Sequence, residues 1–174
     1  YAGRYARQKN IHSILQAFSK IPKKSDNIYL YMVGRDISNK NKELKNYINN
    51  FKLNNKVFFL KQQKNLLEFY NGIDLLLLAS HSESFPNVVA ESMLCSTPVL
   101  SSNAGCSKKI ISKNGFIMEN NDHISILKNI NKILIFFKKN KKYWNFLKKN
   151  SRLQIKKNFS IPNMANSYLK NWTF

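Results

Sequence analysis

Two glutamates, Glu83 and Glu91, carry the most specific chemistry in this 174-residue chain. Both fall within residues 80–93, where an apolar run ends and a helix with Pro86 in its first turn is expected to begin. The free amide groups at a helix start favour an anion. Beside that start, Glu83 could accept hydrogen bonds from sugar hydroxyls, and Glu91, about two turns further on, could reach ribose hydroxyls. Alternatively, Glu83 only caps the helix and Glu91 is a surface residue, but two of only nine acidic residues fall in this one unit.

Polar motifs also follow other expected strands. Gly3-Arg4, Gly34-Arg35 and residues 101–105 each lie at the end of an apolar stretch. Because parallel sheets of α/β proteins bind ligands at the carboxyl ends of their strands, these motifs should lie at the same edge as Glu83. Because several polar motifs all follow strand ends, the sequence predicts a ligand site at this edge of the sheet.

Short apolar runs alternate along the chain with apolar positions at helical spacing. The alternation predicts an α/β fold with a Rossmann-like, doubly wound parallel sheet, helices on both faces, and helices at the C-terminal end. Gly3-Arg4 is interpreted as the end of a strand whose beginning is missing. Further strands are expected at 28–33, 57–60, 73–79, 98–101 and 115–118. Helices are expected at 11–21 with Asn10 as N-cap, 44–51, 66–70 closed by Asn71-Gly72, 86–95, 124–139, 143–157 and 162–172 with Ser160 as N-cap.

The charge is unusually positive, with 29 lysines and arginines against 9 acidic residues and a formal net charge of +20. Such a balance is typical of proteins that bind nucleic acid, an anionic membrane surface or a phosphorylated ligand. The basic residues are nearly all lysine, and Asn, Ile and Phe are also abundant, which an AT-rich genome would produce. Only four arginines are present, whereas nucleic-acid binding favours arginine for bidentate contacts. We therefore expect no nucleic-acid partner, and some attraction to a membrane surface.

Neither metal nor cofactor sites are indicated. The three histidines and two cysteines show no metal-ligand spacing, and no P-loop or dinucleotide-binding glycine motif occurs. No run of about 18 apolar residues is present to span a membrane, and the first residues lack the features of a secretory signal. A cytoplasmic location is expected, with peripheral attachment to the inner face of the membrane.

Residues 80–93 resemble the signature of glycosyltransferase family 4, whose members are retaining enzymes with two Rossmann-like domains facing a cleft (the GT-B fold). In that family a strand ending in Ser is followed by Glu, a small residue, Phe, and Pro or Gly, then by a helix with a second Glu. Further resemblances occur in the family's order along essentially the whole chain. They are Gly3-Arg4 followed by Lys9, Val33-Gly34, residues 95–99, Ala104-Gly105, residues 114–116, and Phe159-Ser160 before the last helix.

The resemblance implies roles for these residues. Arg4 and Lys9 would neutralise the diphosphate of a nucleotide-sugar donor and stabilise it as it departs, while Glu83 would hold the sugar ring and Glu91 the ribose. Gly3 and Gly34 would belong to the donor-binding loops. The amides at the helix start would face phosphate: those of Ser84, Phe85, Asn87 and Val88, since Pro86 has no amide hydrogen. For both Arg4 and Lys9, ordinary surface charge is the alternative.

The sequence departs from the family pattern at several positions. Ser84, Lys61 and Ser96 stand where glycine is common, and Lys109 stands where glutamate is usual. These changes bear on base selectivity and on loop conformation.

The resemblance therefore implies the C-terminal, donor-binding domain of a retaining glycosyltransferase. Residues 1–158 would form the nucleotide-sugar-binding domain and residues 159–174 a C-terminal helix. The N-terminal, acceptor-binding domain would be absent from this chain, so the chain alone is expected to transfer no sugar. A glycan or lipid-linked glycan of the cell envelope is the expected acceptor.

Three other functions remain open. The chain could be a non-catalytic partner subunit of the same fold, a basic nucleic-acid-binding module, or part of a sugar-nucleotide epimerase. Loss of donor binding with intact folding would indicate the first, and affinity for nucleic acid that falls steeply with salt would indicate the second. Product analysis would identify the third.

Overall fold

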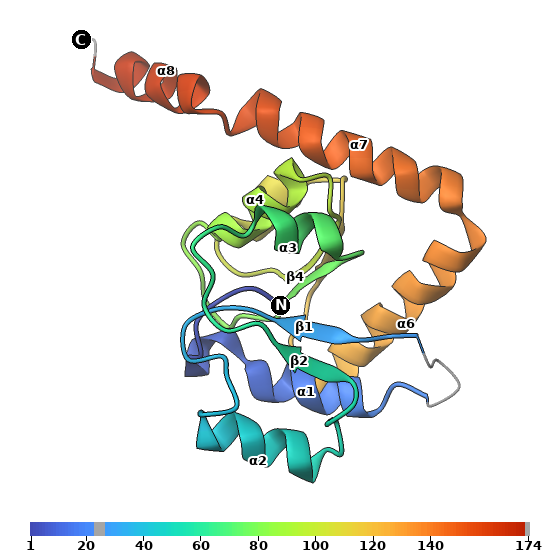
Figure 1. The fold of residues 1–174 in the computed structure, drawn as a ribbon. Helices are drawn as coiled ribbons and strands as arrows, with labels where there is room; N and C mark the ends of the chain where they lie inside the picture. Colours follow the sequence, from blue (N-terminus) through green and yellow to red (C-terminus); the bar gives the residue numbers. More distant parts are fainter. Residues whose placement is uncertain (23–26, 173–174) are drawn as a thin grey trace.

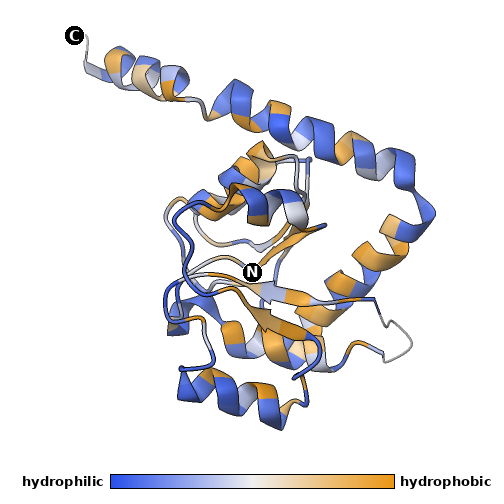
Figure 2. Cartoon of the chain, viewed as in Figure 1, coloured by the Kyte–Doolittle hydropathy of each residue, from blue (hydrophilic) through white to orange (hydrophobic). Residues whose placement is uncertain are grey.

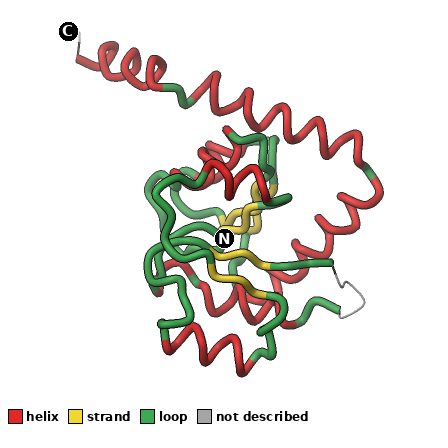
Figure 3. The backbone as a smooth tube through the Cα atoms, viewed as in Figure 1, coloured by secondary structure: helices red, strands yellow, loops and turns green. Residues whose placement is uncertain are grey.

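A computed structural model describes residues 1–22 and 27–172 of the chain. It confirms the expected α/β class, with parallel strands in two groups (Figures 1 and 3). β1 (Leu30–Met32) pairs with β2 (Val57–Phe59). β4 (Val99–Ser102) lies between β3 (Leu76–Leu78) and β5 (Phe116–Met118). The predicted strand end at Gly3 is also present, since Ala2 bridges Val33 in parallel directly after β1.

Eight α-helices and one 3-10 turn connect the strands within the described residues. They are η1 (Arg7–Lys9), α1 (Ile11–Ser19), α2 (Lys42–Asn50), α3 (Leu67–Gly72), α4 (Asn87–Leu94), α5 (Ser107–Ile111), α6 (His123–Lys139), α7 (Lys141–Asn158) and α8 (Ile161–Trp172). Figure 1 shows α1 and α2 on one side of the strands and α3, α4 and α7 on the other. α1 packs against α6, and α4 packs against α7.

The core follows from this layering. Every residue of β3 and β4 is buried, because helices cover both faces of these strands. Figure 2 shows the apolar residues gathered at the strands and on the inner sides of the helices, while α7 is mostly hydrophilic. The buried, rigid strands can therefore hold the loops at their carboxyl ends in fixed positions.

Two local predictions were wrong. Asn71 and Gly72 do not close a helix but belong to α3, which ends where Ile73 becomes extended. Pro86 stands at the N-cap of α4, not in its first turn. Asn10 does stand at the N-cap of α1, as predicted, although its side chain makes no capping hydrogen bond there and its amide donates to the carbonyl of Asn121. The short helix α5 was not predicted.

Candidate functional site

A pocket of about 300 Å³ lies at the carboxyl ends of the first strands. The backbone amide of Gly3 donates to the carbonyl of Val33 at 2.9 Å, and that of Gly34 donates to Lys61 at 2.9 Å. Three strand ends are thereby tied side by side. The pocket is lined by Gly3, Arg4, Val33, Gly34, Arg35, Gln62, Gln63, Leu66 and Val88. It brings together four predicted site residues: Gly3, Arg4, Gly34 and Val88.

Gly34 is required by the close approach of two loops. Its φ is +145°, and a Cβ atom there would lie 2.0 Å from the carbonyl oxygen of Gly3. Only glycine accommodates this contact. The backbone wall of the pocket therefore depends on the absence of a side chain at this position.

Lys9 and Glu83 meet in an ion pair. The Lys9 Nζ lies 2.6 Å from Glu83 Oε1, and the two side chains are only 13% and 9% exposed. Lys9 comes from η1 and Glu83 from the turn between β3 and α4, and the turns themselves are joined because the His81 amide donates to the Gln8 carbonyl at 2.8 Å. A cation and an anion are thus held together where the sequence predicted phosphate and sugar ligands.

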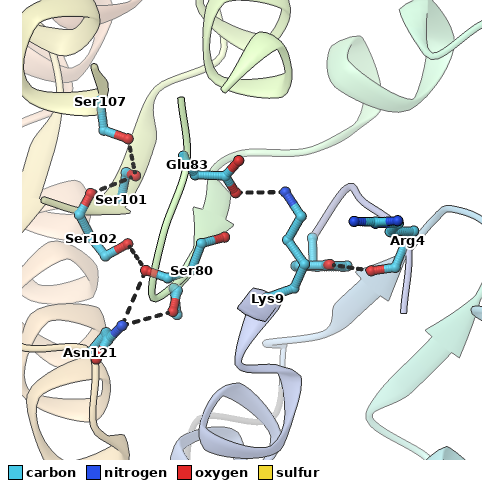
Figure 4. A network of polar contacts seen from close by, with 10 residues as sticks. Arg4, Lys9, Ser80, Glu83, Ser101, Ser102, Ser107 and Asn121 are labelled. Carbon is cyan, nitrogen blue, oxygen red and sulfur yellow. Dashed lines mark hydrogen bonds and ion pairs between the residues drawn. The ribbon is translucent and has the colours of Figure 1, made fainter. Parts of the chain in front are cut away.

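The turn that carries Glu83 is fixed from behind (Figure 4). The side-chain amide of Asn121 donates to the carbonyls of Ala79 and Ser80 at 3.2 and 3.1 Å, and it lies 3.1 Å from Nδ1 of His81. The Ser102 hydroxyl donates to the Ser80 carbonyl at 2.7 Å. The carboxyl end of β3 therefore has little freedom to move.

Gly105 holds the same turn from another side. The residue has a φ of +55°, and a Cβ atom there would lie 2.1 Å from the Glu83 carbonyl oxygen. The neighbouring Cys106 amide donates to the Ser84 carbonyl at 3.0 Å. A side chain at position 105 would displace the backbone of Glu83.

In the close-up of Figure 4, Arg4 is drawn next to Lys9, on the side away from Glu83. Its carbonyl accepts a hydrogen bond of 3.0 Å from the Tyr1 hydroxyl, while its own side chain is exposed. Burial and then the Glu83 carboxylate raise the pKa of that hydroxyl above its usual range, whereas Arg4 acts to lower it. The charges of both Glu83 and Arg4 therefore act on the Tyr1 hydroxyl.

Glu91 lies on α4 and is held by α3. The Tyr70 hydroxyl donates to Glu91 Oε2 at 2.7 Å. Burial and this hydrogen bond raise the pKa of Tyr70 above its usual range. Val88, which lines the pocket, is three residues before Glu91 and so on a neighbouring part of the helix surface. The carboxylate is therefore oriented by a neutral donor and stays free to accept further hydrogen bonds.

The other residues predicted at the start of α4 lie outside the pocket lining. Ser84, Phe85 and Asn87 are exposed, and the Phe85 ring lies 5.8 Å from that of Phe159. Asn87 and Val88 occupy the first turn of α4, where backbone amides have no partner within a helix. The structure thus places these amides at an open helix start but does not bring all four residues into one pocket.

Two departures from the family pattern have a structural consequence. Lys61 and Ser96, which stand where glycine is common, have positive φ angles of 58° and 63°. Both keep a left-handed backbone that glycine adopts more readily. Each of these two residues therefore carries local backbone strain that glycine would avoid.

Several residues of the site were missed from the sequence. Gln62 and Gln63 line the pocket, and Tyr70 and Asn121 hold Glu91 and the Glu83 turn. Gln62 and Gln63 follow an expected strand end, which was a signal that could have been used. No local signal distinguishes Asn121 from the many other asparagines.

Within the described residues, no group of three or more His, Cys, Asp or Glu side chains could hold a metal ion. Likewise, none of the helices described is both long and apolar enough to cross a bilayer.

Residues 1–153 match the family model of glycosyl transferases group 1. The chain is 28% identical over 136 residues to the capsular polysaccharide biosynthesis glycosyltransferase CapM of Staphylococcus aureus. This match covers 77% of the chain but 36% of CapM, so the chain spans about a third of that relative's length.

The fold is similar to those of solved glycosyltransferases. HepE from Anabaena, crystallised with UDP and glucose, matches with a TM-score of 0.81 and 21% identity over 97% of this chain and 46% of HepE. The C-terminal domain of LpcC, a glycosyl transferase group 1 family protein from Francisella tularensis, matches with a TM-score of 0.74 and 20% identity. That match covers 92% of this chain and 84% of the crystallised domain. At these identities the likeness shows the fold alone.

Proposed function

Because this chain belongs to the glycosyl transferases group 1 family, we propose that it binds the nucleoside-diphosphate sugar from which a retaining enzyme takes its sugar. The observation that carries this proposal is the Lys9–Glu83 ion pair at the carboxyl edge of the sheet, near the pocket that Arg4 lines. One site there offers cations suited to a diphosphate and a carboxylate suited to sugar hydroxyls.

The chemistry follows from these groups. Arg4 and Lys9 neutralise the diphosphate and stabilise the negative charge that grows on it as the bond to the sugar breaks. When phosphate attracts Lys9, Glu83 is released from the ion pair and accepts hydrogen bonds from the sugar ring. Glu91, oriented by Tyr70, accepts hydrogen bonds from the ribose. The open helix start of α4 adds amide donors for phosphate.

We assign this chain to the donor-binding half of a GT-B enzyme. Its match to the C-terminal domain of LpcC supports the assignment, as does its coverage of less than half of HepE. A second, N-terminal domain would bind the acceptor across a cleft, so the chain alone should bind donor without transferring sugar. The donor chemistry is assigned to the chain's own cations, and neither a metal nor a cofactor is proposed.

The acceptor is proposed to be a glycan or a lipid-linked glycan of the cell envelope. CapM is named for capsular polysaccharide biosynthesis, which supports this class. The enzyme would then act in the cytoplasm, at the inner face of the membrane. The positive charge of the chain suits such a location.

Calorimetric titration of the chain with UDP-, GDP- and ADP-sugars tests donor binding. We expect saturable binding for one base, and we expect Glu91→Ala to weaken it roughly 10- to 100-fold through loss of charge-assisted hydrogen bonds. Glu68→Ala, an exposed glutamate of α3, is the matched control and should leave the affinity unchanged.

Other results would indicate other functions. A folded chain that binds no sugar nucleotide would be a non-catalytic relative. Binding to duplex DNA or RNA that falls steeply with salt would indicate a nucleic-acid-binding module. An epimerised sugar nucleotide formed by the full-length protein would identify an epimerase.

A further inference from the structure

The last part of the chain is uniformly basic. Every residue after Asp122 that carries a formal charge is a lysine or an arginine. These cations lie on α6, α7 and α8; α6 and α7 pack against α1 and α4, and α8 extends beyond the rest of the domain (Figure 1). These three helices carry no carboxylate side chain to neutralise their lysines, so they favour an anionic partner.

Aromatic and aliphatic side chains are exposed where α6 meets α7. Ile135 and Phe146 are each 56% exposed and Tyr143 is 42% exposed. The Tyr143 ring contacts Phe136 at 5.2 Å and Phe146 at 5.6 Å between centroids. We call Ile135, Phe136, Tyr143 and Phe146 the aromatic corner. Large apolar groups gathered at one protruding bend usually mark an interaction site.

The aromatic corner rests on a firm base. Trp144, next to Tyr143, is only 5% exposed. The centroid of its ring lies 5.0 Å from that of Phe137 and 6.2 Å from that of Phe116 of β5. The corner is therefore anchored to the sheet through Trp144. Its exposed rings are presented by a packed element and not by a loose end.

Lysines flank the residues of the aromatic corner in the sequence. Lys132, Lys138 and Lys139 on α6 and Lys141 and Lys142 on α7 are all exposed. None of these five makes an ion pair with any other described residue. Their charges are therefore available to a partner.

An anionic lipid surface fits this combination best. Aromatic rings and aliphatic groups enter the boundary between headgroups and acyl chains, while lysine ammonium groups contact anionic headgroups. A second copy of the chain would bring two strongly positive surfaces together. Nucleic-acid bases stack on open aromatic faces. The Tyr143 and Phe136 rings instead pack edge to face, with an interplanar angle of 88°, and this packing covers one of the faces on which a base could stack.

We propose that the aromatic corner and its lysines dock the protein on an anionic membrane surface, with α6 and α7 lying on the bilayer and not crossing it. The inference deepens the proposed function by naming the surface that would bring the enzyme to a lipid-linked acceptor. It can be tested separately, because membrane binding needs no sugar nucleotide.

Co-sedimentation of the full chain with vesicles is the test. We expect binding to equimolar phosphatidylcholine and phosphatidylglycerol, weakening with salt, and little binding to phosphatidylcholine alone. Lys138→Gln/Lys139→Gln/Lys142→Gln should lower the partition coefficient by about 100-fold, since each lysine near an anionic surface contributes about fivefold. The matched control, Lys40→Gln/Lys42→Gln/Lys45→Gln, removes the same charge from exposed lysines in and next to α2 and should lower it far less.

The apolar contribution is tested with Ile135→Ser/Phe146→Ser, two exposed positions where substitution does not threaten folding. These changes should lower the partition coefficient about 10-fold or more, whereas Leu67→Ser/Tyr29→Ser, at comparably exposed positions outside α6, α7 and α8, should not. An equal fall in the partition coefficient of the corner and control variants would overturn the proposal, and so would equal binding to both types of vesicle. Tighter binding to duplex DNA than to vesicles, or self-association abolished by the corner variants, would also overturn it. Sugar-nucleotide titration of the same variants shows whether the donor site is intact.

Discussion

The ammonium nitrogen of Lys9 lies 2.6 Å from a carboxylate oxygen of Glu83, although the two residues are 74 positions apart. Each is assigned to a different part of the donor, Lys9 to phosphate and Glu83 to sugar. In the structure, each side chain instead neutralises the charge of the other. On the proposed function, donor binding would replace this ion pair with contacts to the ligand, and the pair would hold both side chains in place in the absence of donor.

Replacing Lys9 with methionine should weaken binding of a nucleoside diphosphate roughly 10- to 100-fold, because one charge-assisted hydrogen bond to phosphate is lost. Methionine keeps an unbranched side chain of nearly the same length but has no charge, and calorimetric titration gives the dissociation constants. Lys40→Met, at an exposed lysine remote from the pair, should bind like the parent chain. Equal affinities for parent and Lys9→Met would remove Lys9 from the donor site.

Gly34→Ala should destabilise the fold by about 2–4 kcal/mol, because the added Cβ would meet the Gly3 carbonyl oxygen at 2.0 Å in a left-handed backbone. Gly72→Ala is the matched control, since no atom lies within 4 Å of a Cβ there and the residue is helical. That substitution should be neutral or stabilise by up to about 1 kcal/mol. Urea unfolding of the two variants measures both effects, and a Gly34→Ala variant as stable as Gly72→Ala would show that the loops do not approach as described.

Asn121→Ala should loosen the Glu83 turn, because the amide that contacts Ala79, Ser80 and His81 is removed. We expect a loss of about 1–3 kcal/mol in the free energy of unfolding and weaker donor binding. Asn129→Ala, on α6, removes one hydrogen bond, to the Ser125 carbonyl, and should leave donor affinity unchanged. If Asn121→Ala is less stable but binds donor like the parent, its role is structural only.

Alkaline pH should destabilise the chain through Tyr70. Its folded-state pKa is raised above the usual value of 10.0 by burial and by the bond to Glu91. Above pH 10 the unfolded state therefore loses this proton first, and stability falls as pH rises. Tyr70→Phe should be less stable near neutral pH by about 1 kcal/mol and should show a shallower decline above pH 10, by up to about 1.4 kcal/mol per pH unit. If the free energy of unfolding falls with pH in the same way for the parent chain and for Tyr70→Phe, Tyr70 is not the group responsible.

Local patterns predicted most of the elements of the fold. The apolar runs at 28–33 and 73–79 contain β1 and β3, but the paired strands are shorter because pairing depends on neighbours that periodicity does not show. Asn71-Gly72 has the composition of a helix end, yet Gly72 has no positive φ and continues α3. Propensity alone does not fix where a helix stops.

The candidate site was predicted in part, for a physical reason. Glu83, Arg4 and Gly34 stand at strand ends, which a parallel sheet gathers at one edge whatever the loops do. The partners of these residues come from distant segments: Tyr70 to Glu91, Asn121 to the Glu83 turn, and Gly105 to the Glu83 backbone. Such contacts depend on tertiary packing and leave no local pattern in the sequence.

NMR spectra of the chain, labelled to report the Lys9 ammonium and the Glu83 carboxylate, provide the most direct measurement of donor binding at this site. Addition of a nucleoside-diphosphate sugar should shift both signals with the same saturation, because phosphate and sugar replace the ion pair. The corresponding nucleoside monophosphate, which lacks the transferred sugar and one phosphate, should shift the two signals less. A sugar nucleotide that saturates the chain and leaves both signals unchanged would contradict the proposed donor site.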